Sequence, residues 1–569
     1  MMSNAATLPS MLQAGLQAQA RGDLAAAERL LAQVAEQAPR QAQAWFALGN
    51  VREDLQRLAE AEVCYRRTAE LMPGLAEAHY NQARMLQRLG RGAEARVAIA
   101  QALRCKPGAA NMLQLRAMLE EEAGDLAAAL QSLDAAIAAA PERAALHHNR
   151  AVVLQRQQQH ALSLAAHERA QALGLDVADA HYNHGNTLRS LGRDDEALAA
   201  YRRALARDPQ HGLALYDLAR LRWNAGDADF AAELRAAEAA APASATAAGI
   251  HARLLLNAER HAEAVELFRR AIARAPAASG YHDGLGLALS RLGRHEEALA
   301  AHEQAVRLAP ADPTARSNHA HSLLAAGRPA EAAAQAEAAL ALAPQDQHVL
   351  ALLGLAWRAL GDPREPWLND YARLVRVFDL PAPDGFADME AFNAALAAEL
   401  TRRHTDRRAP IDQSLREGTQ TRGNLLDEDH PLIVALRRRL AEAIDRYVAE
   451  LPVDAEHPFL RRRGSGWRFT DSWSSRLRST GFHTNHVHAH GWLSSCYYVA
   501  LPAAVDRQGP AGWIKFGEPD LDLGLAPQRI EQPRAGRLVL FPSCFWHGTV
   551  PFDDGGMRLT VAFDVKPLP

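Results

Sequence analysis

The pattern of hydrophobic and polar positions divides the chain into a helical part and a strand-like part. Up to about residue 361, alanine- and leucine-rich stretches predict pairs of helices. From about residue 405 onward, short runs rich in valine, tyrosine and phenylalanine alternate with Pro/Gly turns, which is typical of strands. This change predicts a helical domain at 8–361, a joint at 362–404 and a second domain at 405–569.

The helical part repeats with a period of 34 residues, and its prolines mark the period. Proline ends a helix because it lacks the amide hydrogen and clashes with the preceding turn. Leu175 stands where one proline of the series is missing, and a single step of 33 residues leads to Pro242. The prolines in phase are Pro39, Pro73, Pro107, Pro141, Pro209, Pro242, Pro276, Pro310 and Pro344. About ten helix pairs are expected from this period.

Small residues recur where the two helices of a unit would cross, and bulky residues recur sixteen positions later. The small residues are Gly15, Gly49, Ala83, Gly185, Gly286, Ala320 and Gly354, and the bulky ones are Leu31, Tyr65, Ile99, Leu133, Tyr201 and Phe268. One unit cannot bury its apolar faces alone, so we expect the units to stack into a superhelix with a long concave surface. The pattern resembles tetratricopeptide repeats, which implies a binding role and no particular chemistry.

Asparagine occupies the sixth position of several units: Asn81, Asn149, Asn183 and Asn318. This resembles the asparagine ladder of the O-GlcNAc transferase family, whose first helices line the inner groove. An asparagine amide can pair with a peptide backbone without reading its side chains, so the resemblance implies a protein or peptide partner. The ladder is broken at Ala47, Ile250 and Gly284. The alternative is a groove that is merely polar.

Residues 362–404 do not follow the 34-residue period. A capping helix is predicted from Trp367 to about Val377, followed by a proline-rich exit at Pro381 and Pro383. Two further amphipathic helices are predicted, at about Met389–Arg403 and Pro431–Glu450.

Short strands are predicted throughout the C-terminal part. They are Trp467–Ser472, Leu493–Leu501, Trp513–Phe516, Arg537–Phe541 and Leu559–Val565. Strands of this length and density favour an antiparallel sandwich or jelly roll.

Histidines concentrate in the same part of the chain. The segment GFHTNHVHAHGW contains His483, His486, His488 and His490, and His547 follows a predicted strand. Residues two apart on a strand point to the same side, so His486 and His488 could face one metal ion. His483 and His490 flank that pair, and each is more simply a structural or supporting residue.

The order of these motifs resembles the Fe(II)- and 2-oxoglutarate-dependent oxygenases. The segments TNHVHAHGWLSSCYYVALP and AGRLVLFPSCFWHGTVP, with PIDQSLREGTQTRGNLL before them, are similar to a bacterial and phage subgroup often fused to tetratricopeptide repeats. The implied fold is an all-α tetratricopeptide superhelix followed by a mainly-β double-stranded β-helix (jelly roll) with flanking helices.

The resemblance also implies a ligand set and an activity. His486, His488 and His547 would bind Fe(II), Arg558 would hold 2-oxoglutarate, and a recruited protein or peptide would be hydroxylated. Tyr497 and Tyr498 alternate faces on their strand, so one of them, Tyr498, could either assist cosubstrate binding or pack in the core. The departure is His488, because the superfamily has Asp or Glu at that position and the usual non-haem iron site is two histidines and a carboxylate. A carboxylate could come from elsewhere, for instance Asp553 or Asp554.

Two other functions remain open on the sequence. The C-terminal fold could be a non-catalytic part of an interaction scaffold. It could also be a three-histidine, cupin-type metal dioxygenase that does not use 2-oxoglutarate.

The composition of the chain limits which classes of partner and which cellular compartments are expected. Lys plus Arg is 63 and Asp plus Glu is 67 of 569 residues, a net charge of -4 that argues against nucleic acid. The four cysteines lie far apart, which favours a reducing compartment over a disulfide framework. The N-terminus lacks the pattern of a secretory signal, and no apolar run is long enough to span a membrane. We therefore expect a cytoplasmic location and no membrane partner.

Overall fold

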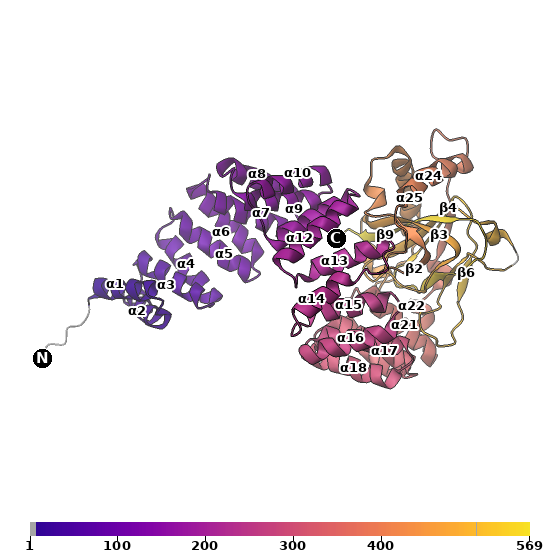
Figure 1. Ribbon diagram of the computed structural model, residues 1–569, viewed down its shortest axis with the longest axis horizontal. Helices are drawn as coiled ribbons and strands as arrows, with labels where there is room; N and C mark the ends of the chain where they lie inside the picture. The colour runs from indigo at the N-terminus through magenta and orange to yellow at the C-terminus, as the bar shows by residue number, and fades with distance from the viewer. Residues whose placement is uncertain (1–6, 508, 569) are drawn as a thin grey trace. The chain divides into compact units, whose positions relative to one another are not determined.

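The computed structural model describes residues 7–507 and 509–568, which fall into two compact units, Met1–Arg207 and Asp208–Pro569 (Figure 1). The first six residues lie outside the described residues. They form part of the segment in which no secretory signal was expected. No described helix is both long and apolar enough to cross a bilayer.

The first unit is a series of paired helices, as the 34-residue period predicts (Figure 1). Within several pairs the turn is made by a glycine with positive φ, such as Gly22 and Gly192. The helices are α1 (Leu8–Ala20), α2 (Leu24–Gln37), α3 (Ala42–Asp54), α4 (Leu58–Leu71), α5 (Ala76–Arg88), α6 (Gly92–Cys105), α7 (Ala110–Glu122), α8 (Leu126–Ala139), α9 (Ala144–Arg156), α10 (His160–Ala172), α11 (Ala178–Ser190) and α12 (Asp194–Arg207).

The predicted alternation of small and bulky residues is confirmed at the helix crossings. A Cβ atom added to Gly185 would lie 2.6 Å from the ring of Tyr201, and one added to Gly49 would lie 2.8 Å from the ring of Tyr65. The Tyr201 hydroxyl donates to Asn186 at 2.7 Å. Each bulky ring therefore fills the space that glycine leaves, and this close packing explains the small residues.

The second unit begins with further helix pairs of the same kind. They are α13 (Gly212–Asn224), α14 (Ala232–Ala240), α15 (Thr246–Asn257), α16 (His261–Arg274), α17 (Ser279–Arg291), α18 (His295–Leu308), α19 (Pro313–Ala325), α20 (Pro329–Leu342) and α21 (Gln347–Leu360). The 33-residue step coincides with the short helix α14.

The capping helix expected from Trp367 to about Val377 is wrong. Its place is taken by two one-turn helices, α22 (Glu365–Leu368) and α23 (Tyr371–Leu374), and a strand, β1 (Arg376–Asp379). The Asp370 side chain accepts from the amide of Arg373 and starts α23 afresh. Strand β1 pairs with β7 (Arg537–Pro542) in an antiparallel register. The segment 362–404 is thus part of the β-rich fold and not only a linker.

Two antiparallel sheets form the C-terminal fold, consistent with the predicted jelly roll (Figure 1). The six-stranded sheet has the order β1-β7-β4-β9-β3-β2 and the three-stranded sheet the order β6-β5-β8. The remaining strands are β2 (Leu415–Gln420), β3 (Trp467–His483), β4 (Leu493–Ala500), β5 (Ile514–Phe516), β6 (Arg529–Glu531), β8 (His547–Thr549) and β9 (Arg558–Pro567). The five predicted strands are confirmed within a few residues, except that β3 extends to His483.

Helices α24 (Met389–Arg403) and α25 (Pro431–Glu450) match their predicted ranges and cover the large sheet (Figure 1). Phe392 of α24 and Ile433 and Ile444 of α25 are fully buried in one core with strand residues such as Tyr497 and Leu538. Short 3₁₀ turns lie at Leu425–Asp427, Leu460–Arg462 and Ala503–Asp506. This core holds the sheet from behind and leaves the ends of β3, β8 and β9 to build the site.

Candidate functional site

Three histidines from two distant segments meet at one edge of the β-rich fold. His486 and His488 follow the end of β3, and His547 begins β8. The amide of His486 donates to the carbonyl of His547 at 2.9 Å, and the reverse bond measures 3.0 Å. This isolated bridge brings the two segments together, and one ring nitrogen from each histidine lies within 4.8 Å of the others. Among the described residues, these three are the group of metal-ligating side chains that comes this close.

Each of the three imidazoles is tethered through its Nδ1 atom. His486 Nδ1 lies 2.7 Å from the carbonyl of Thr484, and His547 Nδ1 lies 2.9 Å from the carbonyl of Phe545. A carbonyl only accepts, so Nδ1 carries the proton and Nε2 keeps a free lone pair. The Nε2 atoms of His486 and His488 are 3.3 Å apart. The tethers therefore aim lone pairs at a shared position, which is the arrangement a metal ion requires.

The electrostatics of the cluster differ between its members. Burial lowers the pKa of His486 to about 3, and the neighbouring His488 adds to the shift. Burial, together with the neighbouring His486 and His488, holds the pKa of His547 well below its usual range. Burial also acts on His488, but the charge of Asp564 outweighs it and raises the pKa of this imidazole. Two rings thus stay neutral and available as ligands, while the third is made more basic by a carboxylate.

Asp564 is the residue of this site that the sequence analysis missed. Its Oδ1 lies 2.6 Å from Nδ1 of His488 and accepts a second bond of 2.6 Å from Ser494. Ser494 in turn contacts Ser543 at 2.8 Å. Asp564 and Arg558 are six residues apart on β9 and therefore share a face of that strand. This even spacing from Arg558 is the feature of the sequence that could have indicated Asp564 as a residue of the site.

The other carboxylates considered for the site have different partners. Asp554 accepts from the amides of Ala504 and Gly556, and Asp553 accepts from the Ser479 hydroxyl. Neither belongs to the three-histidine group. They hold a loop together, so the suggestion that one of them completes the site is wrong in this structure.

The flanking histidines lie outside the three-nitrogen group. Nδ1 of His483 is 3.2 Å from the Ser414 hydroxyl, which also lies 3.3 Å from Nε2 of His486. His490 is exposed. Ser414 comes from the segment before β2 and carried no signal in the sequence. His483 therefore borders the cluster through a serine.

Arg558 is a buried cation with few hydrogen-bond partners. It is 1% exposed, its Nε has no hydrogen-bond partner among the described residues, and Nη2 has only the Cys496 thiol at 3.9 Å. Its guanidinium lies 5.2 Å from the ring centre of Tyr498, whose buried hydroxyl also lacks a partner. Tyr497, on the other face of β4, donates to Asn393 at 2.7 Å instead. Unpaired buried polar atoms are costly, so Arg558 and Tyr498 offer donors that an anionic ligand would satisfy.

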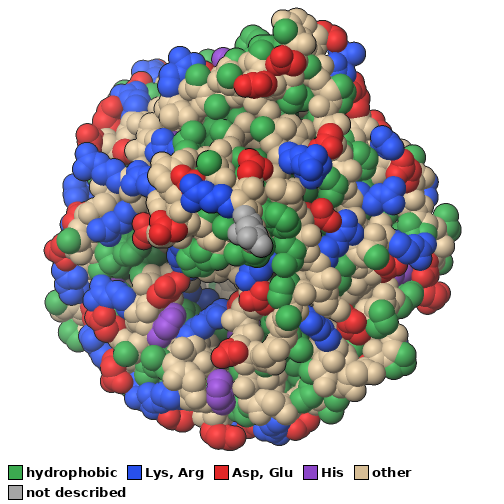
Figure 2. Space-filling view, turned by 90° about the vertical axis from the view of Figure 1, so that its right-hand side faces the viewer, with side chains coloured by type: hydrophobic (Ala, Val, Ile, Leu, Met, Phe, Trp, Pro, Cys, Tyr) green, Lys and Arg blue, Asp and Glu red, His purple; other side chains and the backbone are tan. Residues whose placement is uncertain are grey.

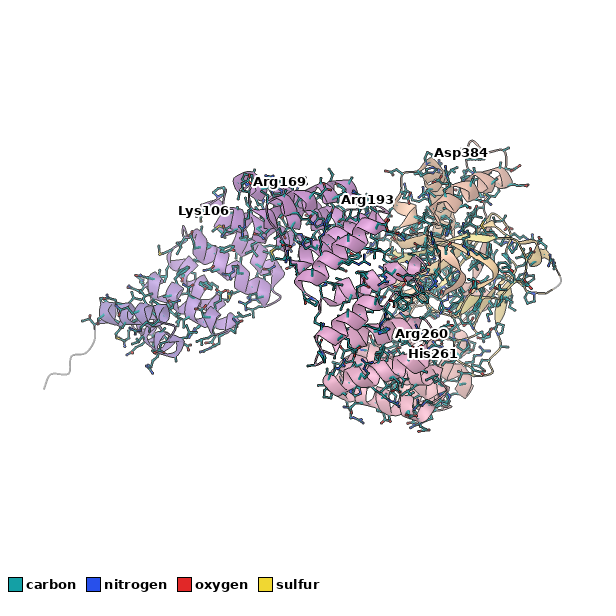
Figure 3. The ribbon with its side chains drawn as sticks, in the orientation of Figure 1. Lys106, Arg169, Arg193, Arg260, His261 and Asp384 are labelled. Atoms are coloured by element: carbon teal, nitrogen blue, oxygen red, sulfur yellow. The ribbon has the colours of Figure 1, made fainter. Side chains whose placement is uncertain are left out.

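A cavity of about 960 Å³ lies within the second unit between the repeats and the β-rich fold. Its repeat side includes Leu256, Glu259 and His261, the last of which is labelled in Figure 3, and its other side includes His483 and Asn485. Most of its charges are already paired. The pairs are Glu259 with Arg416, Arg291 with Asp520, and Lys515 with Glu518. The cavity is thus mixed in polarity and close to neutral. Figure 2 likewise shows acidic and basic side chains interspersed on one face of the molecule.

The four asparagines lie on the first helices of their units, α5, α9, α11 and α19, and all are partly exposed. The amide of Asn318 donates to both carboxylate oxygens of Asp283 at 2.9 Å. Oδ1 of Asn81 faces Arg84 at 3.4 Å. Asn318 is therefore already engaged within the repeats.

Family comparisons agree with both resemblances. Residues 471–564 match a family described as "Putative 2OG-Fe(II) oxygenase". Tetratricopeptide repeats match at 12–74, 250–313 and 317–365, and a second repeat family matches at 178–211. The matches confirm the predicted tetratricopeptide repeats and the predicted similarity of the C-terminal part to this oxygenase family.

Comparison with curated proteins found no match. Among solved structures, yeast Tom70 is 14% identical with a TM-score of 0.38, and covers 64% of this chain and 99% of its own. YrrB, described as a TPR protein with an unusual peptide-binding site, is 20% identical with a TM-score of 0.29 and covers 33% and 96%. Pseudomonas aeruginosa pilF is 17% identical with a TM-score of 0.32 and covers 36% and 92%. Likenesses at these scores say nothing of this chain's function.

Proposed function

We propose that this protein is an Fe(II)- and 2-oxoglutarate-dependent oxygenase that hydroxylates a polypeptide bound by its tetratricopeptide repeats. The observation that carries the proposal is the meeting of three tethered imidazoles with a separate, unpaired Arg558 in one small β fold. One of these features would hold a metal ion and the other a dicarboxylate.

The donor set fits a metal ion. Three neutral nitrogen ligands leave open positions on an ion, which catalytic sites need and closed structural sites lack. His486, His488 and His547 would hold Fe(II), and Asp564 would orient His488 and increase its basicity from behind. Bound Fe(II), with 2-oxoglutarate and dioxygen, supplies the oxidation that places a hydroxyl group on a substrate while 2-oxoglutarate becomes succinate and carbon dioxide.

The surroundings of Arg558 fit the carboxylate of 2-oxoglutarate. A guanidinium makes charge-assisted hydrogen bonds to a carboxylate, frequently two at once. The Tyr498 hydroxyl, which is close to the same cation and has no hydrogen-bond partner in the described part of the chain, would donate a further bond. Binding would therefore satisfy buried polar atoms that are unsatisfied in the protein alone.

The cavity between the repeats and the β-rich fold would admit the polypeptide. It extends from α15–α17 to His483, which borders the three-histidine cluster. Its near-neutral, mixed lining suits an uncharged stretch of polypeptide better than a nucleotide or a phosphate, which would require unpaired basic residues. Asn81, Asn149 and Asn183, in the first unit, would bind the backbone of another part of the substrate.

Anaerobic titration with Fe(II) and 2-oxoglutarate tests this function. Wild-type protein is expected to develop a metal-to-ligand charge-transfer band, and His547→Ala is expected to lose it. With dioxygen, succinate should form, and mass spectrometry of lysate proteins should find one added oxygen atom on the substrate. Folded wild-type protein that gives no band would contradict the proposal, and a band without succinate would indicate a non-catalytic scaffold.

A second function is favoured by one observation, the third histidine where a carboxylate is usual. Cupin-type dioxygenases that use three histidines need no 2-oxoglutarate. In that case Arg558→Ala would keep both metal affinity and turnover. If Arg558→Ala retains metal binding but loses 2-oxoglutarate binding and succinate formation, the protein is a 2-oxoglutarate-dependent oxygenase and not a cupin-type dioxygenase.

A further inference from the structure

The residues beside the three histidines are attached to the last repeats. Val487, between His486 and His488, packs against the apolar core of α19–α21. Trp546, directly before His547, is 5% exposed and belongs to the same core. The His348 ring of α21 meets the indole of Trp546 edge to face at 6.2 Å. The backbone that carries each histidine is therefore packed on repeat residues.

A backbone bond adds to this attachment. Gln347, the first residue of α21, donates its amide to the carbonyl of Ala489 at 3.2 Å. The first amides of a helix have no partner inside the helix. Ala489, directly after His488, satisfies one of them, so the start of α21 and the histidine segment hold each other in place.

The loop 517–527 makes a second connection between the repeats and the histidines. Arg358 of α21 donates to the carbonyls of Gly517 and Ala526 at 2.6 and 2.8 Å. The carboxylate of Asp520 pairs with Arg291 of α17 and lies 3.4 Å from Nε2 of His321 on α19. Three repeat helices thus hold the loop.

The loop in turn contacts the residues just before the histidines. The carbonyl of Pro519 accepts from the Asn485 side chain at 2.8 Å, and Asn485 precedes His486. The amide of Gly517 donates to the carbonyl of Trp546 at 2.9 Å, and Trp546 precedes His547. Contacts from Arg358 and Asp520 therefore lead to both histidine segments within a few bonds.

We infer that the last tetratricopeptide repeats position the metal centre, so that metal affinity is set by Arg358 and Asp520 as well as by the histidines. The inference rests on the proposed metal site and goes beyond it, because it makes the repeats a part of the site and not only a recruiting surface. Ligand positions must be held closely for tight binding, and loss of supporting contacts costs metal affinity. Because coupling between two sites is reciprocal, metal binding must in turn stabilise the contacts that Arg358 and Asp520 make.

Co(II), which can be followed by its visible absorption, is the probe in full-length protein. Arg358→Met and Asp520→Asn are expected to bind Co(II) about 10- to 100-fold more weakly than wild type. The matched control is Arg328→Gln, on the same repeats, whose exposed side chain pairs with Glu331, and Co(II) affinity should stay within about twofold of wild type. Melting curves show whether each variant is folded.

Hydrogen exchange of the wild type tests the inference without any variant. Co(II) should slow exchange in 517–527 and at the start of α21, and leave α1–α4 unchanged. The inference is overturned if both folded variants bind Co(II) as wild type does, or if exchange in these segments does not respond to bound Co(II). Wild-type protein that takes up no Co(II) overturns the proposed metal centre, and the inference with it.

Discussion

Nδ1 of His488 lies 2.6 Å from Oδ1 of Asp564, so the carboxylate nearest this cluster stands behind a histidine and not beside the other ligands. In the usual non-haem iron site a carboxylate is itself a ligand. The structure has one in the position of a supporting group, where it orients the ring and makes Nε2 a stronger donor to a metal ion.

Replacing Asp564 should weaken metal binding without removing it. In Asp564→Asn the shape is kept but the charge on the hydrogen bond to His488 is lost, and Co(II) affinity is expected to fall about 10- to 100-fold. Isothermal titration of the full-length protein measures this. Asp553→Asn, an exposed neighbour outside the cluster, is the control. Equal affinities in wild type and Asp564→Asn would show that Asp564 has no part in the centre.

Arg558→Met should separate stability from cosubstrate binding. Among the residues that the structure describes, the buried guanidinium has no carboxylate partner, so an apolar side chain of similar length should keep or raise the melting temperature. The same change should weaken 2-oxoglutarate binding to the Co(II)-loaded protein about 10- to 100-fold, as expected for loss of hydrogen bonds to a charged group. A lower melting temperature with unchanged 2-oxoglutarate affinity would make Arg558 a structural residue.

Acid should destabilise the repeats around His302. Burial, with His321 and His319 nearby, lowers the pKa of this fully buried histidine to about 3, below the value of about 6.5 for an exposed ring. The folded state thus favours the neutral ring. Its contribution is complete above about pH 6.5 and is lost progressively as the pH falls toward 3.

Between pH 6.5 and 4 the loss from His302 amounts to about 3 kcal/mol at most. Asp283, 3.8 Å away, is the acidic group that faces the ring. His302→Phe, which cannot titrate, should flatten this part of the curve of unfolding free energy against pH. Chemical denaturation at a series of pH values measures it, and parallel curves for the two proteins would refute the assignment.

Gly185→Ala should destabilise the first unit. The added Cβ would lie 2.6 Å from the Tyr201 ring, and overpacking of this kind costs about 1–3 kcal/mol. Gly74→Ala is the matched control, since a Cβ there meets no atom within 4 Å and needs no unusual backbone angle. Thermal melting should show a lower midpoint for Gly185→Ala alone. Co(II) affinity should be unchanged in both, because neither residue lies in the second unit.

Features that depend on local pattern could be predicted from the chain alone. The 34-residue period, the pairing of small with bulky positions, helices α24 and α25 and five of the strands could all be read from spacing, because helix and strand periodicities are properties of neighbouring residues. The order of His486, His488, His547 and Arg558 was also visible, since a motif is itself a local spacing.

Which distant groups meet follows from tertiary packing and not from local pattern. Residues 376–379 form a strand because β7 offers an edge more than 150 residues away, which outweighs the local preference for a helix. Asp564 reaches His488 because β4 and β9 pair, and Trp546 lies against the repeats because α21 packs on the histidine segments. These contacts depend on strand register and domain packing, which are set by burial across the whole fold and leave no periodic trace in the chain.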